Sequence, residues 1–367
     1  MTPLGEKIAL LIAGNGPITV ADYMALALGD PEHGYYMARE PFGRAGDFVT
    51  APEISQIFGE LIGLWAVAAF EAMGAPPRLA LVELGPGRGT LMADLLRAAR
   101  VRPAFLAAAE VHLVESSPRL RDVQMATLGA GAATWHDTVA TLPTGPSIVV
   151  ANEFFDALPV RQYVRTEAGW AERMVGLDET GNLAFGLRPL AGPPSSPLPA
   201  QEKGRPAGSG AGQDTVLEVS PASTAVMATL AERLAAAGGA LLAIDYGYEG
   251  PAFGDTLQAV AGHRYADPLA EPGAADLTAH VDFAALARAA EAAGARPRPL
   301  LGQGDFLARL GIAARAARLA AGKDAATQDA IAAAVNRLVA PAAMGRLFKV
   351  LAVSHSGLAL PAFDDDA

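Results

Sequence analysis

The chain has 367 residues, of which 51% are hydrophobic and none is cysteine. At one to two hundred residues per domain, this length predicts two domains or one α/β domain with large insertions. The lack of cysteine excludes disulfides, thiolate zinc sites, iron–sulfur ligation and a cysteine nucleophile. A formal net charge of −11 disfavours nucleic acid as a substrate, because the protein's field repels phosphate backbones.

Targeting and metal signals are also lacking in the sequence. No window long enough to span a membrane is both apolar and uncharged, so we expect no stable membrane insertion. Glu6 and Lys7 precede the first apolar stretch, without the basic opening and small-residue cleavage site of a signal peptide. The six histidines show no metal-ligand spacing, so we predict no metal site.

The first half of the chain predicts a helical cap followed by alternating strands and helices. Residues 1–78 carry apolar runs of helical period around a polar, glycine-rich stretch, which predicts a helical N-terminal cap. Residues 79–159 then alternate short apolar strands with amphipathic helices. This order is typical of an α/β fold with a parallel, Rossmann-like sheet.

The second half predicts two insertions into this framework. Residues 160–219 alternate with period two and predict a β-rich insertion, within which the Pro-, Gly- and Ser-rich segment 191–213 is expected to be a mobile surface loop. The framework resumes over 220–302. A helical insertion is expected over 303–342, and a closing strand with a solvated acidic tail over 343–367.

The sharpest motif is the glycine-rich turn that joins the first framework strand to a helix. It reads Glu-Leu-Gly-Pro-Gly-Arg-Gly and contains Glu83, Gly85, Gly87 and Gly89. Such a turn lets the backbone approach a ligand closely and directs unpaired helix N–H groups at an anionic group. The alternative interpretation is a tight strand-to-helix turn without a ligand.

Two ligand classes fit this turn poorly. A triphosphate-binding loop requires lysine after the glycines, whereas Thr90 follows Gly89. A dinucleotide site requires G-x-G-x-x-G and an acid about twenty residues further on. Here the third glycine comes one residue early and Glu115 lies thirty residues after Gly85.

The turn together with Glu115 resembles the S-adenosyl-L-methionine site of class I methyltransferases. The resemblance implies that the turn holds the amino-acid end of the cofactor and that Glu115, at the end of the second strand, holds the ribose hydroxyls. Carboxylates suit this ligand, because its amine and sulfonium are cationic. Asp137 follows the third strand, where such folds touch adenine; the alternative is that it caps the next helix.

The loop that leaves the fourth strand carries the candidate catalytic groups. It reads Asn-Glu-Phe-Phe-Asp-Ala-Leu-Pro over 152–159. Ligands of α/β sheets lie outside the carboxyl ends of the strands, so we expect Glu153 and Asp156 to face the reacting centre and Asn152 to contact the cofactor. The alternative is that the two carboxylates cap the segment or pair with arginines.

A polar segment within the cap is a further candidate. In Gly46–Ser55, we assign Thr50 and Glu53 to the cofactor site, on the hypothesis that the segment closes over the cofactor and excludes water. The alternative is that Thr50 or Ser55 is a helix N-cap.

These motifs together resemble the MidA family of class I methyltransferases. The resemblance rests on Gly46–Ser55 with Phe58-Gly-Glu60, the turn Glu83–Gly89, the loop 152–159, and Leu277-Thr-Ala-His-Val-Asp-Phe283, in this order along nearly the whole chain. It implies symmetric dimethylation of an arginine in a core subunit of respiratory complex I, supporting assembly of that complex in a bacterial cytoplasm. A carboxylate can orient a guanidinium bidentately, and we assign this role to Glu153, with Asp156 second.

Two other functions are compatible with the same motifs. One is a methyltransferase that acts on a small molecule. The other is a non-catalytic assembly or scaffold protein that keeps the S-adenosyl-L-methionine site as a folding or sensing element.

Overall fold

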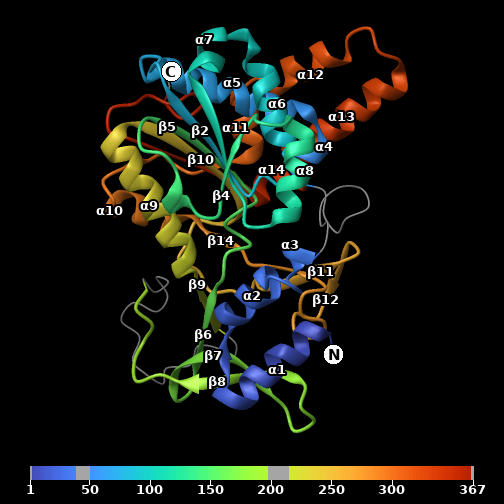
Figure 1. Ribbon diagram of the computed structural model, residues 1–367, viewed down its shortest axis with the longest axis vertical. Coiled ribbons are helices and arrows are strands. Elements are labelled where there is room, and N and C mark those ends of the chain that lie inside the picture. The colour runs from blue at the N-terminus through green and yellow to red at the C-terminus, as the bar shows by residue number, and fades with distance from the viewer. Residues whose placement is uncertain (1, 39–49, 197–214, 365–367) are drawn as a thin grey trace. The chain divides into compact units, whose positions relative to one another are not determined.

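The computed structural model describes residues 2–38, 50–196 and 215–364, shown in Figure 1. They fall into two compact units, each assembled from three stretches of chain. Unit 1 comprises Met1–Phe48, Phe155–Ala225 and Tyr248–Ala285, and unit 2 comprises Val49–Phe154, Val226–Gly247 and Leu286–Ala367. Among the described helices, none is both long and apolar enough to cross a membrane.

Unit 2 is built on a mostly parallel sheet, which confirms the predicted fold class. Its strands lie in the order β17-β10-β5-β2-β3-β4, and β17 is antiparallel to β10 whereas the other neighbours are parallel. Their bounds are β2 (Leu79–Leu84), β3 (Ala109–Val114), β4 (Thr134–His136), β5 (Ser147–Asn152), β10 (Gly239–Tyr248) and β17 (Phe348–Ser354), with β15 (Arg296–Pro297) and β16 (Leu301–Gly302) paired to β17. Every residue of β5 is buried, as expected for a central strand covered on both faces.

The strand order reverses between β2 and β5. From β2 the chain proceeds outward to β3 and β4, then returns to place β5 on the other side of β2. Leu84, near the end of β2, pairs with Val114 in β3 and Ala151 in β5, so the carboxyl ends of all three strands meet at one edge. This is the topological switch point at which open α/β sheets bind ligands.

The helices of unit 2 pack around this sheet. They are α4 (Ala51–Ile54), α5 (Gln56–Ala72), α6 (Thr90–Ala98), η1 (Ala99–Val101), α7 (Pro103–Ala108), α8 (Pro118–Leu128), η2 (Val139–Thr141), α11 (Gln303–Arg309), α12 (Ile312–Ala320), α13 (Ala325–Val339) and α14 (Met344–Leu347); α9 (Pro221–Ala237) and α10 (Phe283–Ala292) continue into it from unit 1. Phe58, Trp65 and Phe70 of α5 are buried in the core. The close approach of α5 to α6 requires Gly63, because a Cβ there would lie 2.7 Å from the carbonyl oxygen of Leu95.

A buried carboxylate joins three helices of unit 2. Glu60 of α5 is 4% exposed and accepts hydrogen bonds from Arg97 Nη2 of α6 at 3.0 Å and from Arg315 Nε of α12 at 2.7 Å. Burial alone would raise the pKa of Glu60, but the two guanidinium groups outweigh it and hold that pKa below its usual value. The Phe58-Gly-Glu60 part of the family motif therefore has a structural explanation.

Unit 1 combines three helices with two antiparallel sheets. Its helices are α1 (Pro3–Asn15), α2 (Val20–Gly29) and α3 (Tyr35–Ala38). One sheet has the order β1-β7-β6-β9 with β8 paired to β7, and the other has the order β12-β11-β13. The strand bounds are β1 (Ile18–Thr19), β6 (Arg161–Thr166), β7 (Gly169–Leu177), β8 (Leu183–Pro189), β9 (Thr215–Val219), β11 (Gln258–Ala261), β12 (Arg264–Ala266) and β13 (Asp276–Thr278), and the unit also holds β14 (Val281–Asp282).

The two units cut across the segments expected from the sequence. The expected cap 1–78 is divided, since α1–α3 belong to unit 1 and α4 and α5 to unit 2. The strands of 160–219 form one sheet in unit 1, which also includes residues 248–285. The predicted loop 191–213 lies outside the described residues from position 197 onward.

The expectation of a solvated acidic tail is wrong for its first residue. Asp364 Oδ2 accepts a hydrogen bond from Arg298 Nε at 3.0 Å, and the Arg298 side chain is 1% exposed. A buried guanidinium needs a counterion, and Asp364 supplies it. The remaining acidic residues of the tail lie outside the described residues.

We predict that Glu60→Gln lowers the free energy of unfolding by about 1.5–3 kcal/mol, the usual contribution of hydrogen bonds to charged groups. The contribution of a carboxylate with a lowered pKa is present above its ordinary value of 4.5 and is lost as the pH falls through the folded-state pKa. The difference in the free energy of unfolding between parent and variant, measured by urea unfolding, should therefore shrink as the pH falls below 4.5.

Glu71→Gln is the matched control. Glu71 pairs with Arg102 at 2.8 Å, but both side chains are about half exposed, so this change should cost less than about 1 kcal/mol. Equal losses for the two variants would show that the Glu60 cluster does not stabilise unit 2.

Candidate active site

The glycine-rich turn lies at the switch point, between the end of β2 and the start of α6. Gly85, Gly87 and Gly89 have φ of 57°, 53° and 79°, a region that favours glycine. A Cβ on Gly85 would lie 3.0 Å from the ring of Phe154, in the loop that follows β5. The turn therefore leads sharply into α6, and the backbone N–H of Met92, in the first turn of this helix, donates to Glu83.

Glu83, the acid that precedes the turn, is suited to a cationic ligand. It is 3% exposed, and burial raises its pKa to about 8. Its Oε2 atom is buried and has no hydrogen-bond partner among the described residues, and the same holds for Oδ1 of Asn152. Orphaned buried acceptors beside a glycine turn fit the amino-acid end of S-adenosyl-L-methionine, which carries both an ammonium and a carboxylate.

Glu115 follows β3 and is held by its own side-chain contacts. It is 8% exposed, its Oε1 accepts from Ser117 N–H at 2.8 Å and its Oε2 accepts from Gln124 Nε2 at 3.2 Å. Burial raises the pKa of Glu115, and the bonds from Ser117 and Gln124 partly counter the rise. A fixed, buried carboxylate is the kind of group that recognises paired hydroxyls, which fits the proposed ribose contact.

Asp137 lies on the surface after β4. Its side chain is 79% exposed and pairs with Arg121 Nη2 at 2.5 Å. Arg121 also donates through Nε to the carbonyl oxygen of Glu115, at 2.8 Å. The following short helix, η2, has Thr138 at its N-cap position, so capping by Asp137 is not observed. The contact of Asp137 with adenine stays a prediction.

Glu153 occupies a strained position at the end of β5. Its φ is 52°, which is unusual for a residue with a side chain, and its N–H donates to the carbonyl oxygen of Ile244 at 2.9 Å. Its Oε1 atom accepts from the N–H of Ala51 and from Asn152 Nδ2, both at 3.1 Å. Backbone strain of this kind persists where the surroundings over-determine it, and it concentrates at functional sites.

The short helix α4 is tied to both the turn and the Glu153 loop. Ala51 donates to Glu153, while Glu53 Oε1 accepts from Thr90 Oγ1, at the start of α6, at 2.6 Å. Thr50 is the N-cap residue of α4 but makes no side-chain capping bond, whereas Ser55 caps α5 by accepting from Ile57 N–H. These contacts support the hypothesis that this segment belongs to the site.

Asp156 belongs to unit 1. It is 6% exposed, and its carbonyl oxygen accepts from Ala279 N–H at 3.0 Å. Within the same unit, the hydroxyl of Tyr36 donates to Asp276 at 2.9 Å, and burial, with the nearby charges of Asp276 and Asp156, raises the pKa of Tyr36. The catalytic role of Asp156 stays a prediction.

Three residues of the site were not predicted from the sequence. Thr90 binds Glu53, Asp245 accepts from Phe154 N–H at 3.2 Å, and Gln124 contacts Glu115. Thr90 follows the last glycine of the turn directly, so its position was a usable signal. Asp245 carries no local signal, because Phe154 lies 91 residues away, and Gln124 carries none that relates it to Gly87, which lies 37 residues away.

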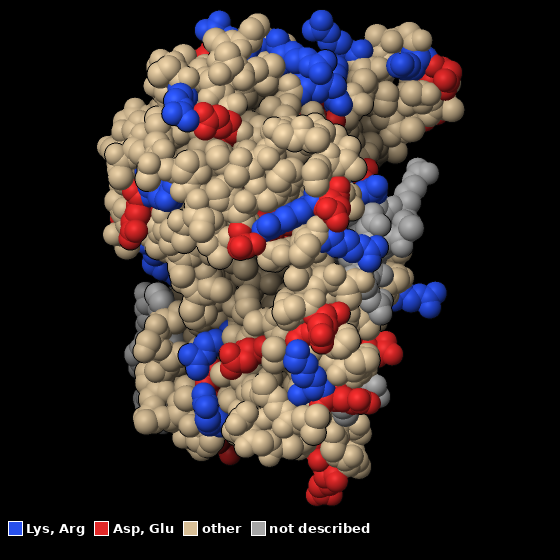
Figure 2. Space-filling view, viewed as in Figure 1, with Lys and Arg blue, Asp and Glu red and all other residues tan. Residues whose placement is uncertain are grey.

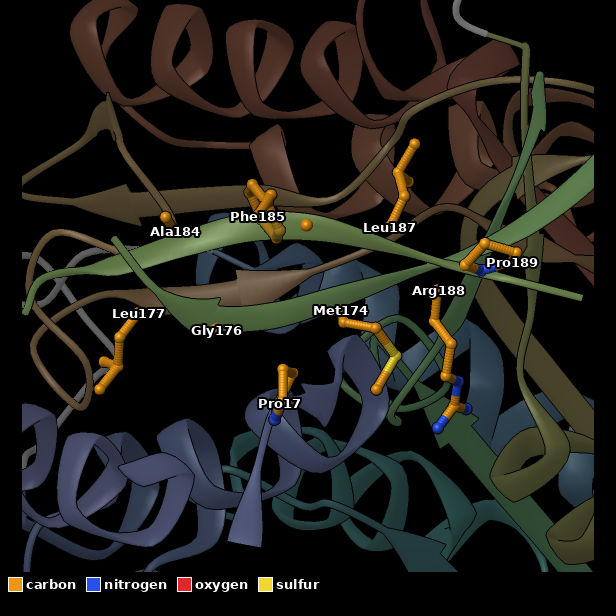
Figure 3. Close-up of a pocket in the computed structure, with 10 residues that line it drawn as sticks. Pro17, Met174, Gly176, Leu177, Ala184, Phe185, Leu187, Arg188 and Pro189 are labelled. Atoms are coloured by element: carbon orange, nitrogen blue, oxygen red, sulfur yellow. The ribbon is translucent and has the colours of Figure 1, made fainter. Parts of the chain in front are cut away.

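Neither metal-ligand clusters nor the hollow on unit 1 adds a candidate site within the described residues. Among the residues described, no group of three or more His, Asp or Glu could hold a metal ion. A hollow of about 540 Å³ on unit 1 lies between Pro17 and strands β7 and β8 (Figure 3). Its only charged lining residue, Arg188, pairs with Glu172, and none of the predicted site residues lines it.

The switch-point turn, the two buried acids and the loop after β5 define a class I methyltransferase that depends on S-adenosyl-L-methionine. A family model described as "Putative S-adenosyl-L-methionine-dependent methyltransferase" matches residues 61–300. The chain belongs to this family.

Relatives and solved structures agree with this assignment. The chain is 37% identical to mouse "Protein arginine methyltransferase NDUFAF7, mitochondrial", over 96% of this chain and 84% of the relative. It is 38% identical to the Drosophila melanogaster homologue, over 97% and 86%. A Burkholderia thailandensis crystal structure bound to S-adenosyl-homocysteine is 34% identical with a TM-score of 0.83, covering 99% of this chain and 94% of that one.

We predict that Gly87→Val weakens binding of S-adenosylhomocysteine, measured by calorimetry, by at least tenfold, or about 1.4 kcal/mol. A branched side chain at φ 53° is strained and blocks close approach of the ligand to the backbone. Gly131→Val is the control, because Gly131 also has positive φ but a Cβ there meets nothing within 4 Å. Unchanged binding in Gly87→Val, or an equal loss in the control, would contradict the assignment of the turn.

We also predict that S-adenosylhomocysteine binding at pH 7 releases a proton from Glu83. With its pKa near 8, Glu83 is mostly protonated in the free protein, and a cationic amine favours its ionised form. The release, about one proton, should fall off as the pH rises above 8. Calorimetry in two buffers of different ionisation enthalpy measures it, and Glu83→Gln should remove it; equal release in the variant would exclude Glu83 as the source.

Proposed function

We propose that the protein is an arginine N-methyltransferase that acts on a protein substrate. The observation that carries this proposal is the strained Glu153, whose carboxylate is held by the N–H of Ala51 and the amide of Asn152 at the end of β5. A carboxylate fixed in this way suits a guanidinium, which presents a planar fork of donors. The names of the mouse and Drosophila relatives support the same substrate class.

The chemistry follows from the residues on unit 2. S-adenosyl-L-methionine, when bound, supplies an electrophilic methyl group on a sulfonium. The glycine turn and Glu83 would hold its amino-acid end, and Glu115 would hold its ribose. Glu153 orients the guanidinium of the substrate and stabilises its positive charge. Methyl transfer forms a nitrogen–carbon bond while the carbon–sulfur bond of the sulfonium breaks, S-adenosylhomocysteine is the leaving group, and the Glu153 carboxylate accepts the proton that the methylated nitrogen loses. Alignment of the two reactants contributes most of the rate.

The finer assignment rests on the family resemblance. We infer that the substrate is a core subunit of respiratory complex I, that the product is symmetric dimethylarginine, and that the modification supports assembly of the complex in a bacterial cytoplasm. A nucleic-acid partner is disfavoured by the net charge of −11. On the face shown in Figure 2, basic and acidic side chains are interspersed, apart from a cluster of basic side chains at the upper edge.

We predict that Glu153→Gln lowers methyl transfer by at least about a hundredfold, the usual cost of removing a group that stabilises transition-state charge. Binding of S-adenosylhomocysteine should change less than about threefold, or 0.7 kcal/mol, because Glu153 acts on the substrate. Transfer of labelled methyl groups to the hydrophilic arm of complex I, purified from cells that lack this protein, measures the effect. Glu71→Gln serves as the control.

The same assay separates the two alternatives. If Glu153→Gln transfers methyl groups normally, Glu153 is not the catalytic carboxylate. If the parent methylates no protein, and if the parent and Glu153→Gln restore complex I assembly in cells to the same extent, the protein is a scaffold. Labelling of a low-molecular-weight fraction in place of protein would indicate a small-molecule methyltransferase.

A further inference from the structure

Gln124 is a fully buried amide in the middle of α8. Its Nε2 donates to the carbonyl oxygen of Gly87 at 2.8 Å and to Glu115 Oε2 at 3.2 Å. Its Oε1 accepts from Trp135 Nε1, in β4, at 2.8 Å. One side chain with no solvent exposure therefore contacts the glycine turn, the acid after β3 and the strand β4.

The orientation of this amide is determined by Trp135. An indole N–H can only donate, so the atom that faces it must be the amide oxygen. Both N–H groups of the amide therefore point at Gly87 and Glu115, and each has an acceptor within hydrogen-bond distance. The three bonds leave no alternative flipped state of equal energy.

The contacts of Glu115 show what the amide does. Ser117 N–H donates to Oε1, Gln124 donates to Oε2, and the backbone of Ser116 contributes a further hydrogen bond to the carboxylate. With both oxygens held, the plane of the carboxylate is fixed, and Gln124 is the side chain that restrains Oε2. Helix α8 also packs against the turn itself, since a Cβ on Gly89 would lie 3.6 Å from Cα of Gln124.

We infer that Gln124 is a positioning residue that locks the carboxylate of Glu115 to the glycine turn and so sets the affinity for the ribose hydroxyls of the cofactor. This inference rests on the proposed assignment of Glu115 to the ribose. It explains why a polar side chain occupies a site with no solvent exposure: an apolar residue would leave Gly87 O, Glu115 Oε2 and Trp135 Nε1 unsatisfied.

The test compares two ligands by calorimetry: S-adenosylhomocysteine and its analogue without the ribose 2′- and 3′-hydroxyls. In Gln124→Met, which keeps the length of the side chain, the preference of the protein for the hydroxylated ligand should fall by about tenfold, or 1.4 kcal/mol. Affinity for the analogue should change less than about threefold, or 0.7 kcal/mol. A merely structural loss would weaken both ligands equally and leave the preference unchanged.

Two further variants keep the test decisive. Gln303→Met is the matched control, because Gln303 is also fully buried in unit 2 and its Nε2 donates to the carbonyl oxygen of Leu338 at 2.9 Å. It should leave the preference unchanged. Trp135→Phe removes the donor that orients the amide but keeps Gln124, and it should reduce the preference about threefold, or 0.7 kcal/mol. It provides the measurement if Gln124→Met does not fold.

Glu115→Ala separates failure of this inference from failure of the underlying assignment. If Glu115→Ala abolishes the preference while Gln124→Met and Trp135→Phe retain it, Gln124 is not a positioning residue and the ribose assignment stands. If Glu115→Ala retains the preference, the ribose assignment itself is wrong and the inference falls with it. Loss of the preference in all three variants supports both.

Discussion

The structure of the candidate site depends on one sharp turn, in which three glycines with positive φ carry the chain from β2 into α6. Because the turn lies where the strand order reverses, the ends of β3 and β5 bring Glu115 and Glu153 to the same edge of the sheet. The surrounding helices are attached to it, α4 through the bond from Thr90 to Glu53 and α8 through the bond from Gln124 to Gly87. A side chain in the turn would disturb all of these contacts together.

Three buried glutamates of unit 2, Glu60, Glu83 and Glu115, differ in their partners. Glu60 accepts from two guanidinium groups, which lower its pKa and let it join helices. Glu83 and Glu115 are as deeply buried, but burial is the dominant influence on them and raises the pKa of each. A desolvated carboxylate without a basic partner costs stability, and a cationic or hydroxyl-bearing ligand recovers part of that cost. Glu60 therefore stabilises the fold, and we propose that Glu83 and Glu115 serve binding.

The fold class and the position of the glycine turn were predictable because their signals are local. The apolar run of β2, the glycines that follow it and the helical period of α6 are adjacent in the sequence, and each reflects a short-range rule of backbone geometry. The expectation for Asp364, the first residue of the acidic tail, failed for a different reason. The partner of Asp364 is Arg298, 66 residues away, and no local pattern indicates that this guanidinium is buried.

The sequence by itself determined the parallel sheet, the glycine turn and the acids at the strand ends, since these follow from periodicity and from the conformations that glycine permits. Only the tertiary structure decided which side chains hold that site in place. Ala51 meets Glu153 across 102 residues, and Gln124 meets Gly87 across 37. Such contacts depend on how strands and helices are ordered in space, and an amide or a backbone N–H has no sequence signature that names its partner.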